Sequence, residues 1–421
     1  MKTQVIALAA AQVKTINKET HMSLRILQFG TGIFLRGFWS DLVQRMNDSG
    51  ADLKITSVKL TASAEKEPES AFTAPWTLRL RGLVEGREYD AQSLISCNDA
   101  YLNPFADPAG FLASARDPEI AVVVSNSTEA GIAWFPAPRE SATSFPARLC
   151  LWLEERHRSG LAAPLILPFE LIEDNGAKLR DLVLRHAAEW QTPMAFQGWL
   201  GEKCAFRNTL VDRIVTRDAA GAVNAEPYAF LAIDGAQREE LLPLSRCAID
   251  FLWTDSLRPY RQRKVGLLNG GHTALVFPAL DAGHATVIEA MRDPQMRGFL
   301  EELMLREIVP SLALSSGLGG AELRRYALGV LDRFANPFLQ HQLLAIALNS
   351  SSKFRVRLEP SRAAYQQLFG TPPPLISRAF DSFRRAVCDG RIEGDILHLA
   401  GTSPRSFRDD PEALRQLKSQ N

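Results

Sequence analysis

Apolar positions in the first half of the chain switch between short continuous runs and helical spacing. The run at 120–124 is apolar on both faces, which is typical of a parallel strand covered by helices. Between such runs, apolar residues from Phe34 to Met46 and across 176–189 recur at helical spacing. Strands that alternate with helices predict βαβ units and a doubly wound, Rossmann-type α/β sheet. The predicted strands occupy residues 25–29, 53–60, 120–124 and 164–169.

The second half of the chain has a different pattern. From about Leu242 onward strand signals become sparse, and prolines separate segments with helical spacing. We therefore predict a dinucleotide-binding domain over 22–241 and a mostly α-helical substrate domain over 242–421, with a boundary between Asp234 and Cys247. The predicted helical segments are 245–255, 262–280, 283–307, 321–332, 336–348, 359–369, 374–388 and 411–419.

Residues 1–21 precede the first predicted strand. His21-Met22 has the form of a common cloning junction, so we expect residues 1–21 to be a vector-derived or disordered extension. The apolar run near the start is too short for a convincing signal peptide, and no run of about 18 apolar residues is present.

Composition narrows the class of protein. Lys plus Arg and Asp plus Glu both number 48, so the net charge is zero and nothing favours a nucleic-acid or membrane partner. The five cysteines are far apart and include no C-x-x-C pair, which argues against a disulfide framework and a cysteine-rich zinc site. We expect a cytoplasmic monomer or small homo-oligomer that acts on a small molecule.

A glycine turn follows the first predicted strand. Gly30 and Gly32 form a G-x-G pattern before a predicted helix, where backbone N–H groups and the helix dipole can hold a pyrophosphate. Leu35 stands where a third glycine is usual, so a plain tight turn is the alternative. The acidic residue expected after the second strand is missing, and Lys59 or Ser63 could accept a 2′-phosphate. The choice between NAD and NADP stays open.

Three polar residues stand among apolar ones and glycines at Lys264, Asn269 and His272. In a helix, Asn269 and His272 share a face, and Lys264 lies about 7–8 Å below Asn269 along the axis. A lysine held from water can exchange a proton, and an amide can stabilise a developing alkoxide. Singly, each residue has a structural alternative, namely a snorkelling lysine, a turn-capping asparagine and a core histidine.

Asn175 follows the predicted strand 164–169. Its position predicts a place at the carboxyl edge of the sheet, where ligands bind in open α/β folds. The structural alternative is an asparagine that caps the next helix.

The spacing Lys264…Asn269…His272 resembles the K-x-x-x-x-N-x-x-H signature of the polyol-specific long-chain dehydrogenases, the mannitol dehydrogenase family. Four more segments resemble that family in the same order along the chain. They are residues 29–36, 125–131, 208–214 and 333–337.

The resemblance implies metal-independent hydride transfer between a nicotinamide cofactor, NAD with NADP not excluded, and a substrate CH–OH or carbonyl group. It implies that Lys264 is the general acid/base, that Asn175 and Asn269 polarise the carbonyl, and that His272 and Arg333 contact the substrate. It also predicts a set of cofactor-binding residues. These are Phe29, Gly30, Gly32, Ile33, Phe34, Ser125, Asn126 and Thr128.

Within the family, the chain resembles the tagaturonate reductase (altronate oxidoreductase) branch. That branch implies a keto-sugar acid as substrate. We expect its carboxylate to be bound by Arg333, or by Lys353 and Arg355, for which plain surface charge is the alternative. Phe169 and Gly271 depart from the branch, which has Cys and often Pro there. The alternatives are a neutral polyol dehydrogenase such as mannitol 2-dehydrogenase, a fructuronate reductase, and a catalytically silent NAD(P)-binding sensor.

Overall fold

The computed structural model describes residues 23–62, 68–128, 131–389, 391–393, 396–398 and 405–419. The predicted extension at 1–21 and Ser63 lie outside the described residues. The chain divides into two compact units, each described by itself below. The first comprises Met1–Trp76, Leu94–Asn208 and Gln237–Ala248, and the second comprises Thr77–Ser93, Thr209–Ala236 and Ile249–Asn421.

The first unit contains a six-stranded parallel sheet, which confirms the predicted Rossmann-type fold. Its strand order is β5-β2-β1-β6-β7-β8, so the order reverses between β1 and β6. Ligands bind at such a switch point in open α/β sheets. The strands are β1 (Leu24–Phe29), β2 (Leu53–Val58), β5 (Asn98–Leu102), β6 (Ile120–Ser125), β7 (Leu165–Pro168) and β8 (Ala205–Phe206).

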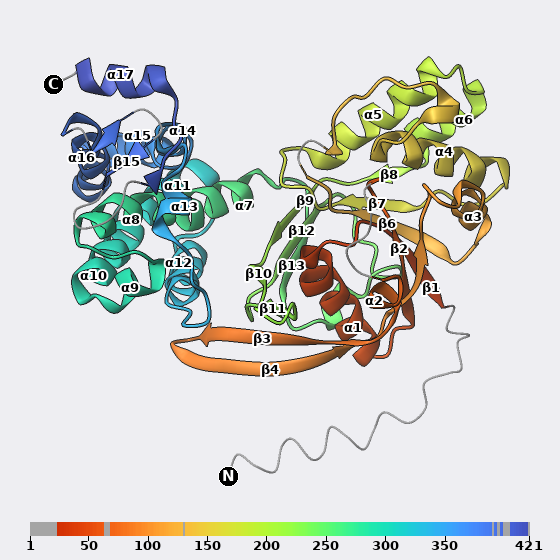
Figure 1. Cartoon of the computed structure of the whole chain (residues 1–421), viewed down its shortest axis with the longest axis horizontal. Coiled ribbons are helices and arrows are strands. Elements are labelled where there is room, and N and C mark those ends of the chain that lie inside the picture. Colours follow the sequence, from red (N-terminus) through yellow and green to blue (C-terminus); the bar gives the residue numbers. More distant parts are fainter. Residues whose placement is uncertain are drawn as a thin grey trace, which may run out of the picture. The chain divides into compact units, whose positions relative to one another are not determined.

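Helices cover both faces of this sheet. Helix α1 lies on one side, and α4, α5 and α6 lie on the other (Figure 1). The core between the sheet and α4 is aromatic, since the Phe29 ring lies 4.9 Å from that of Phe145 and 6.0 Å from that of Phe111. The helices are α1 (Ser40–Asp48), α2 (Ser70–Thr73), α3 (Pro108–Ala113), α4 (Phe145–Arg158), α5 (Asn175–Glu189) and α6 (Met194–Glu202).

The second unit takes strands from both predicted domains. One sheet has the order β10-β11-β3-β4 and another has the order β13-β12-β9. Strand β13 follows residue 242 and pairs with β12, which precedes it, so this unit combines strands from both predicted segments, 22–241 and 242–421. The strands are β3 (Trp76–Val84), β4 (Arg87–Ile95), β9 (Thr209–Asp212), β10 (Val215–Arg217), β11 (Val223–Ala225), β12 (Phe230–Asp234) and β13 (Asp250–Thr254).

Two predicted helical segments are wrong. Residues 245–255 hold only a 3₁₀ turn, Leu244–Arg246, before strand β13, because Asp250–Thr254 pairs in parallel with Phe230–Asp234. Within 336–348 only α13 (Leu343–Ala347) is helical, since the Asn336 side chain accepts a hydrogen bond from the Phe338 backbone and forms a turn instead.

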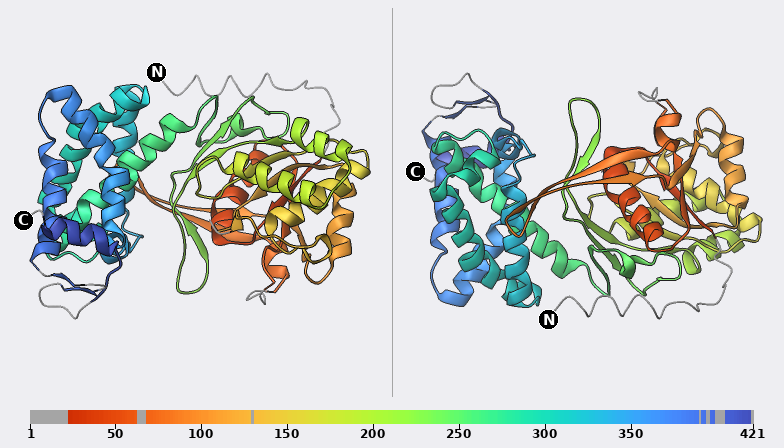
Figure 2. Two further views of the ribbon diagram at one scale, coloured as in Figure 1. Left: turned by 90° about the horizontal axis from the view of Figure 1, so that it is seen from above. Right: turned by 90° about the horizontal axis from the view of Figure 1, so that it is seen from below.

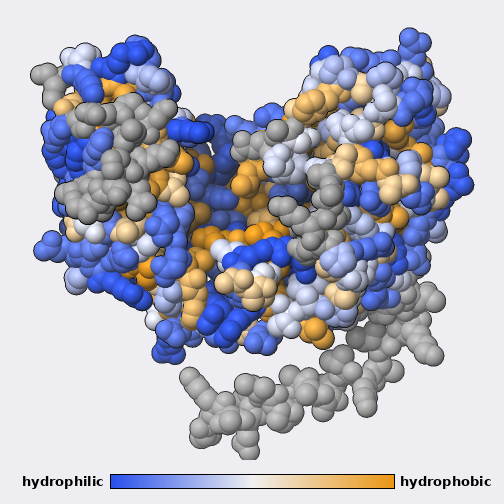
Figure 3. Space-filling model, viewed as in Figure 1, coloured by the Kyte–Doolittle hydropathy of each residue, from blue (hydrophilic) through white to orange (hydrophobic). Residues whose placement is uncertain are grey.

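Most of the remaining helices contribute side chains to one large apolar core, whereas α7 (Arg258–Arg263) packs with β12 in a smaller cluster. Figure 2 shows these helices gathered together. None of the helices among the described residues is long and apolar enough to cross a membrane. Hydrophilic side chains cover much of the outward surface in Figure 3. The helices are α7 (Arg258–Arg263), α8 (Gly270–Asp281), α9 (Val287–Arg292), α10 (Pro294–Glu302), α11 (Val309–Ser316), α12 (Gly320–Phe334), α14 (Ser350–Arg357), α15 (Glu359–Phe369), α16 (Pro374–Cys388) and α17 (Pro411–Ser419); β14 (Ile392–Glu393), β15 (Ile396–Leu397) and β16 (Arg405–Ser406) form a small sheet.

Candidate active site

The glycine turn after β1 has the geometry that the sequence predicts. Gly30 has φ +123°, which L side chains rarely adopt, and a Cβ there would lie 3.0 Å from both the Asn126 carbonyl oxygen and Leu35 Cδ1. At Gly32, by contrast, a Cβ would meet nothing within 4 Å. Gly30 therefore serves the fold of the turn, and Gly32 leaves open space in front of the backbone.

That open space belongs to a cavity of about 450 Å³ at the carboxyl ends of β1, β2 and β6. Four of the predicted cofactor residues line it, namely Gly30, Gly32, Asn126 and Thr128. Its full lining is Gly30, Thr31, Gly32, Lys59, Leu60, Thr61, Asn126, Ser127, Thr128, Gly131, Phe135, Ser144 and Phe145.

The other four predicted cofactor residues support the cavity from behind or from the side. Phe29 and Ser125 are buried, and Ile33 and Phe34 are partly buried at the start of the following helix, where Phe34 stacks on Phe38. None of these four is among the lining residues.

Glu170 is a residue that the sequence analysis did not select. Its buried carboxylate accepts hydrogen bonds from Ser125 Oγ at 3.0 Å, Ser127 N at 2.8 Å and Ser127 Oγ at 3.0 Å. Burial raises the pKa of Glu170, although the hydrogen bonds from Ser127 act in the opposite direction. The carboxyl group thus holds the loop that contributes Asn126 and Thr128 to the cavity. The only local signal was a charged residue directly after a buried strand.

We predict that Glu170→Ala weakens dinucleotide binding at this cavity by about tenfold or more, because it leaves the two serines without their buried acceptor. Glu170→Gln is expected to retain most of the affinity, since its amide can accept from Ser127 and donate to Ser125. Titration of dinucleotide fluorescence measures both variants. Equal affinity of Glu170→Ala and the parent protein would show that the loop does not depend on this carboxyl group.

Asn175 lies where the sequence predicts, at the carboxyl edge of the sheet and at the start of α5. Its Nδ2 donates to the Pro168 carbonyl oxygen at 2.8 Å and to the Glu170 carbonyl oxygen at 3.1 Å, and its Oδ1 accepts from Gly176 N. Asp174 before it adopts a left-handed conformation, with φ +53°. In this structure the amide therefore holds the 168–175 loop, and its role toward a carbonyl substrate stays a prediction.

Lys264 and Asn269 bound a π-helix in the second unit, η6 (Lys264–Asn269), between α7 and α8. In a regular α-helix residues five apart differ by about 140° around the axis. Because π-helical hydrogen bonds join residues i and i+5, the π-helix brings Lys264 and Asn269 toward one face. The sequence analysis assumed an ordinary helix and missed this feature, which is often found at functional sites.

The Lys264 amine is held by polar groups of β9 rather than by apolar neighbours alone. Nζ donates to the Val211 carbonyl oxygen at 2.8 Å and lies 3.6 Å from Asp212 Oδ1. The side chain keeps 18 % of its surface exposed. The amine is therefore fixed against β9, while part of the side chain stays accessible.

Arg333 joins two buried carboxylates behind Lys264. Its guanidinium donates to both oxygens of Asp212, at 2.9 and 3.0 Å, and to both oxygens of Glu226, at 2.9 and 2.8 Å. Tyr326 also donates to Asp212 at 3.1 Å. Although burial opposes ionisation, Arg333 and Lys264 lower the pKa of Asp212 to about 2, whereas burial raises the pKa of Glu226. Asp212 is therefore a fixed negative charge beside Lys264.

The family resemblance implies that Arg333 contacts the substrate, but in the structure its guanidinium is engaged by two carboxylates. The structure places the guanidinium in four hydrogen bonds to Asp212 and Glu226. Asp212 and Glu226 were not among the predicted site residues, although Asp212 lies within the family-like segment 208–214.

His272 lies on α8, three residues after Asn269, and its ring stacks on Phe334 at 3.8 Å and 13°. Burial, and next the neighbouring His341, hold the pKa of His272 well below its ordinary value. The imidazole is therefore neutral near pH 7, and can donate one hydrogen bond and accept another. The Asn269 side chain has no hydrogen-bond partner among the described residues, so its amide remains available.

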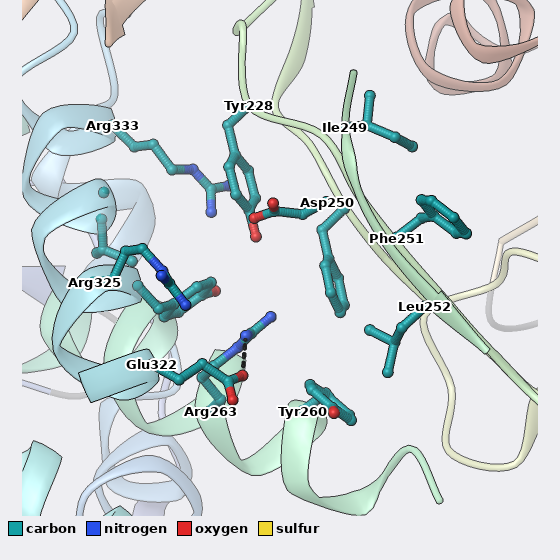
Figure 4. Close-up of a pocket in the computed structure, with 14 residues that line it drawn as sticks. Tyr228, Ile249, Asp250, Phe251, Leu252, Tyr260, Arg263, Glu322, Arg325 and Arg333 are labelled. Carbon is teal, nitrogen blue, oxygen red and sulfur yellow. Dashed lines mark hydrogen bonds and ion pairs between the residues drawn. The ribbon is translucent and has the colours of Figure 1, made fainter. Parts of the chain in front are cut away.

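A second cavity, of about 690 Å³, lies beside Arg333 (Figure 4). Arg263 enters it with its guanidinium 4.4 Å from the Tyr326 ring centre and pairs with Glu322 at 2.8 Å. Its lining is Tyr228, Phe230, Ile249, Asp250, Phe251, Leu252, Tyr260, Arg263, Glu322, Arg325, Tyr326, Gly329, Val330 and Arg333. Arg333 thus both lines this cavity and pairs with Asp212.

Across the part of the chain that the structure describes, no group of three or more His, Cys, Asp or Glu side chains is placed to hold a metal ion. The two acidic residues nearest Lys264 and Arg333, Asp212 and Glu226, are instead engaged by Arg333.

Two models of known protein families match most of the chain. The mannitol dehydrogenase Rossmann domain matches residues 24–244, and the mannitol dehydrogenase C-terminal domain matches residues 256–376. The chain belongs to the mannitol dehydrogenase family. The resemblance inferred from five short segments is thereby confirmed, and the protein is an oxidoreductase of this family.

Curated members of the mannitol dehydrogenase family include similar proteins named altronate oxidoreductase. That of Yersinia enterocolitica is 40% identical over 396 residues, covering 87% of this chain and 81% of the relative. That of Klebsiella pneumoniae strain 342 is 38% identical over 413 residues, covering 91% and 84%.

Solved structures share the fold of this mannitol dehydrogenase family member. A substrate-free D-sorbitol dehydrogenase superposes with a TM-score of 0.79 at 22% identity, covering 94% of this chain and 86% of that one. Mannitol 2-dehydrogenase of Pseudomonas fluorescens, in complex with NAD and D-mannitol, gives a TM-score of 0.68 at 21% identity, covering 94% and 84%.

Proposed function

We propose that the protein reduces a keto-sugar acid of the tagaturonate type to its aldonate with NADH, and catalyses the reverse oxidation with NAD. The observation that carries this proposal is the π-helix that presents both a fixed amine, Lys264, and an available amide, Asn269. The family membership and the altronate oxidoreductase relatives support the reaction class and the substrate.

Lys264 is proposed to pass a proton to the carbonyl oxygen during reduction and to take it back during oxidation. The Val211 carbonyl and the Asp212 carboxylate hold the amine in place for this transfer. Bound NADH supplies the hydride to the carbonyl carbon. The proton and the hydrogen bonds come from side chains, so the proposed mechanism needs no metal.

Asn269 is proposed to donate its amide N–H to the oxygen that gains negative charge as the carbonyl is reduced. Neutral His272, three residues later, is proposed to hydrogen-bond a substrate hydroxyl. Asn175 in the first unit is the second amide that the family resemblance implies, and Asn175→Ala kinetics test its part separately from that of Asn269.

The cavity after β1 suits a dinucleotide. Gly32 leaves space for a phosphate to approach the backbone, and the turn lies at the start of a helix, where an anion is favoured. Asn126 and Thr128 are proposed to contact the cofactor on the opposite side of this cavity. Lys59 also lines it, so NADPH belongs in the test beside NADH.

We predict that Gly32→Ala mainly weakens NADH binding, whereas Gly30→Ala mainly lowers the melting temperature. Gly32→Ala is expected to fold with a melting temperature close to that of the parent but to bind NADH at least about tenfold more weakly, because the methyl group fills the space before the phosphate. Gly30→Ala is expected to lower the melting temperature itself, since φ +123° and two contacts at 3.0 Å disfavour a Cβ. Thermal melting with and without NADH separates the two effects, and unchanged NADH affinity in folded Gly32→Ala would contradict the assignment.

A substrate panel tests the proposed function. Tagaturonate, fructuronate and fructose are assayed with NADH and with NADPH, and the expected result is the highest kcat/KM for tagaturonate with NADH. Preference for fructose would indicate a neutral polyol dehydrogenase, and preference for fructuronate the neighbouring reductase. Binding of NADH without turnover of any keto-sugar acid would indicate a sensor.

A further inference from the structure

Helix α14 carries two basic side chains on the face that packs against the helix after Lys264. Lys353 and Arg357 are four residues apart and so share a face of α14, whereas Arg355 lies on the exposed side. Helix α14 contacts both α8 and the π-helix η6. Arg357 reaches the segment that carries Asn269 and His272, and Lys353 lies one turn earlier on the same face of α14.

Arg357 makes this contact directly. Its Nη1 donates to Thr273 Oγ1 at 3.1 Å and to the Asn269 carbonyl oxygen at 3.5 Å. The side chain is partly buried, and burial lowers its pKa. These bonds occupy one nitrogen of the guanidinium and fix its orientation, and the other two nitrogens have no hydrogen-bond partner among the residues that the structure describes.

Lys353 is held in a similar way one helical turn earlier. Its Nζ donates to the Ile346 carbonyl oxygen at 2.7 Å. Burial, and next the positive charge of Arg357, lower the pKa of Lys353, while Asp409 acts in the opposite direction. The two cations are therefore close enough to repel each other.

Two histidines complete the cluster. The His272 ring meets the His341 ring edge-on at 5.0 Å. Partial burial and then Lys353 lower the pKa of His341, and Arg357 is one of the groups that lower the pKa of His272. Arg357 and Lys353 thus place positive charge close to His272 and His341, respectively.

Lys353 and Arg357 differ from Arg333 in how their charges are balanced. The Arg333 guanidinium is balanced by Asp212 and Glu226, both within ion-pair distance. Among the described residues, neither Lys353 nor Arg357 lies within ion-pair distance of a carboxylate. Burying two neighbouring cations with only the nearby Asp409 carboxylate to oppose them is costly, and an anionic ligand would offset that cost.

We propose that Lys353 and Arg357 together bind the carboxylate of the substrate and so select keto-sugar acids over neutral ketoses. Arg333 and Arg355 do not take this role, because the first already makes four hydrogen bonds to two carboxylates and the second is exposed on the other face of α14. The inference rests on the proposed function and identifies which side chains set its substrate class. The link from Arg357 to Asn269 connects the carboxylate end of the substrate to the carbonyl end.

The test compares Arg357→Gln and Lys353→Gln with the control Arg355→Gln from the same helix. For each, kcat/KM is measured for tagaturonate and for its neutral analogue tagatose, and calorimetry measures altronate binding. Loss of a charge-assisted hydrogen bond is expected to lower the acid-to-neutral ratio of kcat/KM, and the altronate affinity, by about 10- to 100-fold in the first two variants. The control is expected to change neither. Thermal melting identifies any variant that fails to fold, and Lys353→Arg, which keeps the charge, then replaces it, with altronate affinity expected to be kept within a few-fold.

These outcomes distinguish a failure of the proposed carboxylate subsite from a failure of the proposed function. If the parent enzyme prefers tagaturonate and folded Arg357→Gln and Lys353→Gln keep that preference, the carboxylate subsite is wrong while the proposed function stands. If the parent enzyme turns over tagatose as well as tagaturonate, the substrate class itself is wrong. Equal losses in Arg355→Gln and Arg357→Gln would also overturn the inference, since they would show a general charge effect.

Discussion

Replacing Lys264 by alanine is expected to lower kcat for reduction at least about 100-fold, because a positioned acid/base group contributes roughly 10²–10⁴ in rate. NADH affinity is expected to stay within a few-fold, since Lys264 is not among the residues that line the proposed cofactor cavity. Stopped-flow measurement of NADH oxidation, with NADH binding followed separately by fluorescence, gives both quantities.

Lys264→Arg is the matched control for charge. It keeps a cation next to Asp212 but cannot give up its proton in the working pH range. We therefore expect Lys264→Arg to be as slow as Lys264→Ala within about tenfold. Recovery of most of the activity in Lys264→Arg would mean that the positive charge, rather than proton transfer, is what the reaction needs.

Replacing Arg333 by methionine is expected to destabilise the protein by about 3–5 kcal/mol, because it leaves Glu226 buried without its cation and Asp212 with Lys264 alone. Arg333→Lys is expected to recover only part of this loss, since an ammonium cannot make two bidentate contacts. Denaturant unfolding measures the free energy of unfolding of each variant.

The control for Arg333 is Arg324→Met on the same helix, α12, where the side chain is exposed. That change is expected to alter the free energy of unfolding by less than about 0.5 kcal/mol. A loss in Arg333→Met no larger than in Arg324→Met would show that the buried network contributes little to stability.

The buried network of Arg333, Asp212 and Glu226 also predicts that the free energy of unfolding decreases at acid pH. Asp212 has its pKa lowered to about 2 in the folded protein, below the ordinary value of 3.8. Its contribution is therefore fully present above about pH 4 and is lost as the pH falls toward 2. Glu226, whose pKa is raised by burial, contributes in the opposite sense as the pH rises. In Arg333→Met the part of this pH dependence that comes from Asp212 is expected to be smaller.

Local sequence patterns were sufficient to predict the fold class and much of the glycine turn after β1. The apolar run at 120–124 predicted a strand covered on both faces, and β6 is buried in the centre of the sheet. The G-x-G pattern predicted a cavity in front of Gly32. Both features depend on residues close together in the sequence.

Features that depend on distant residues could not be predicted in the same way. Arg333 and Asp212 are 121 residues apart, and no local pattern indicates their pairing. The segment 245–255 was assigned to a helix, yet its strand character comes from pairing with β12. The π-helix at Lys264 likewise depends on packing in the second unit, and an ordinary helical period does not indicate it.

The central claim is that Lys264 exchanges the proton during carbonyl reduction. The most direct test is the pH dependence of kcat/KM for tagaturonate from pH 6 to 10 in the parent enzyme and in Lys264→Ala. We predict a pH-dependent limb in the parent that is absent from the variant, together with a rate at least about 100-fold lower at the optimum. Near-normal turnover of Lys264→Ala across this pH range, with the limb retained, would contradict the account.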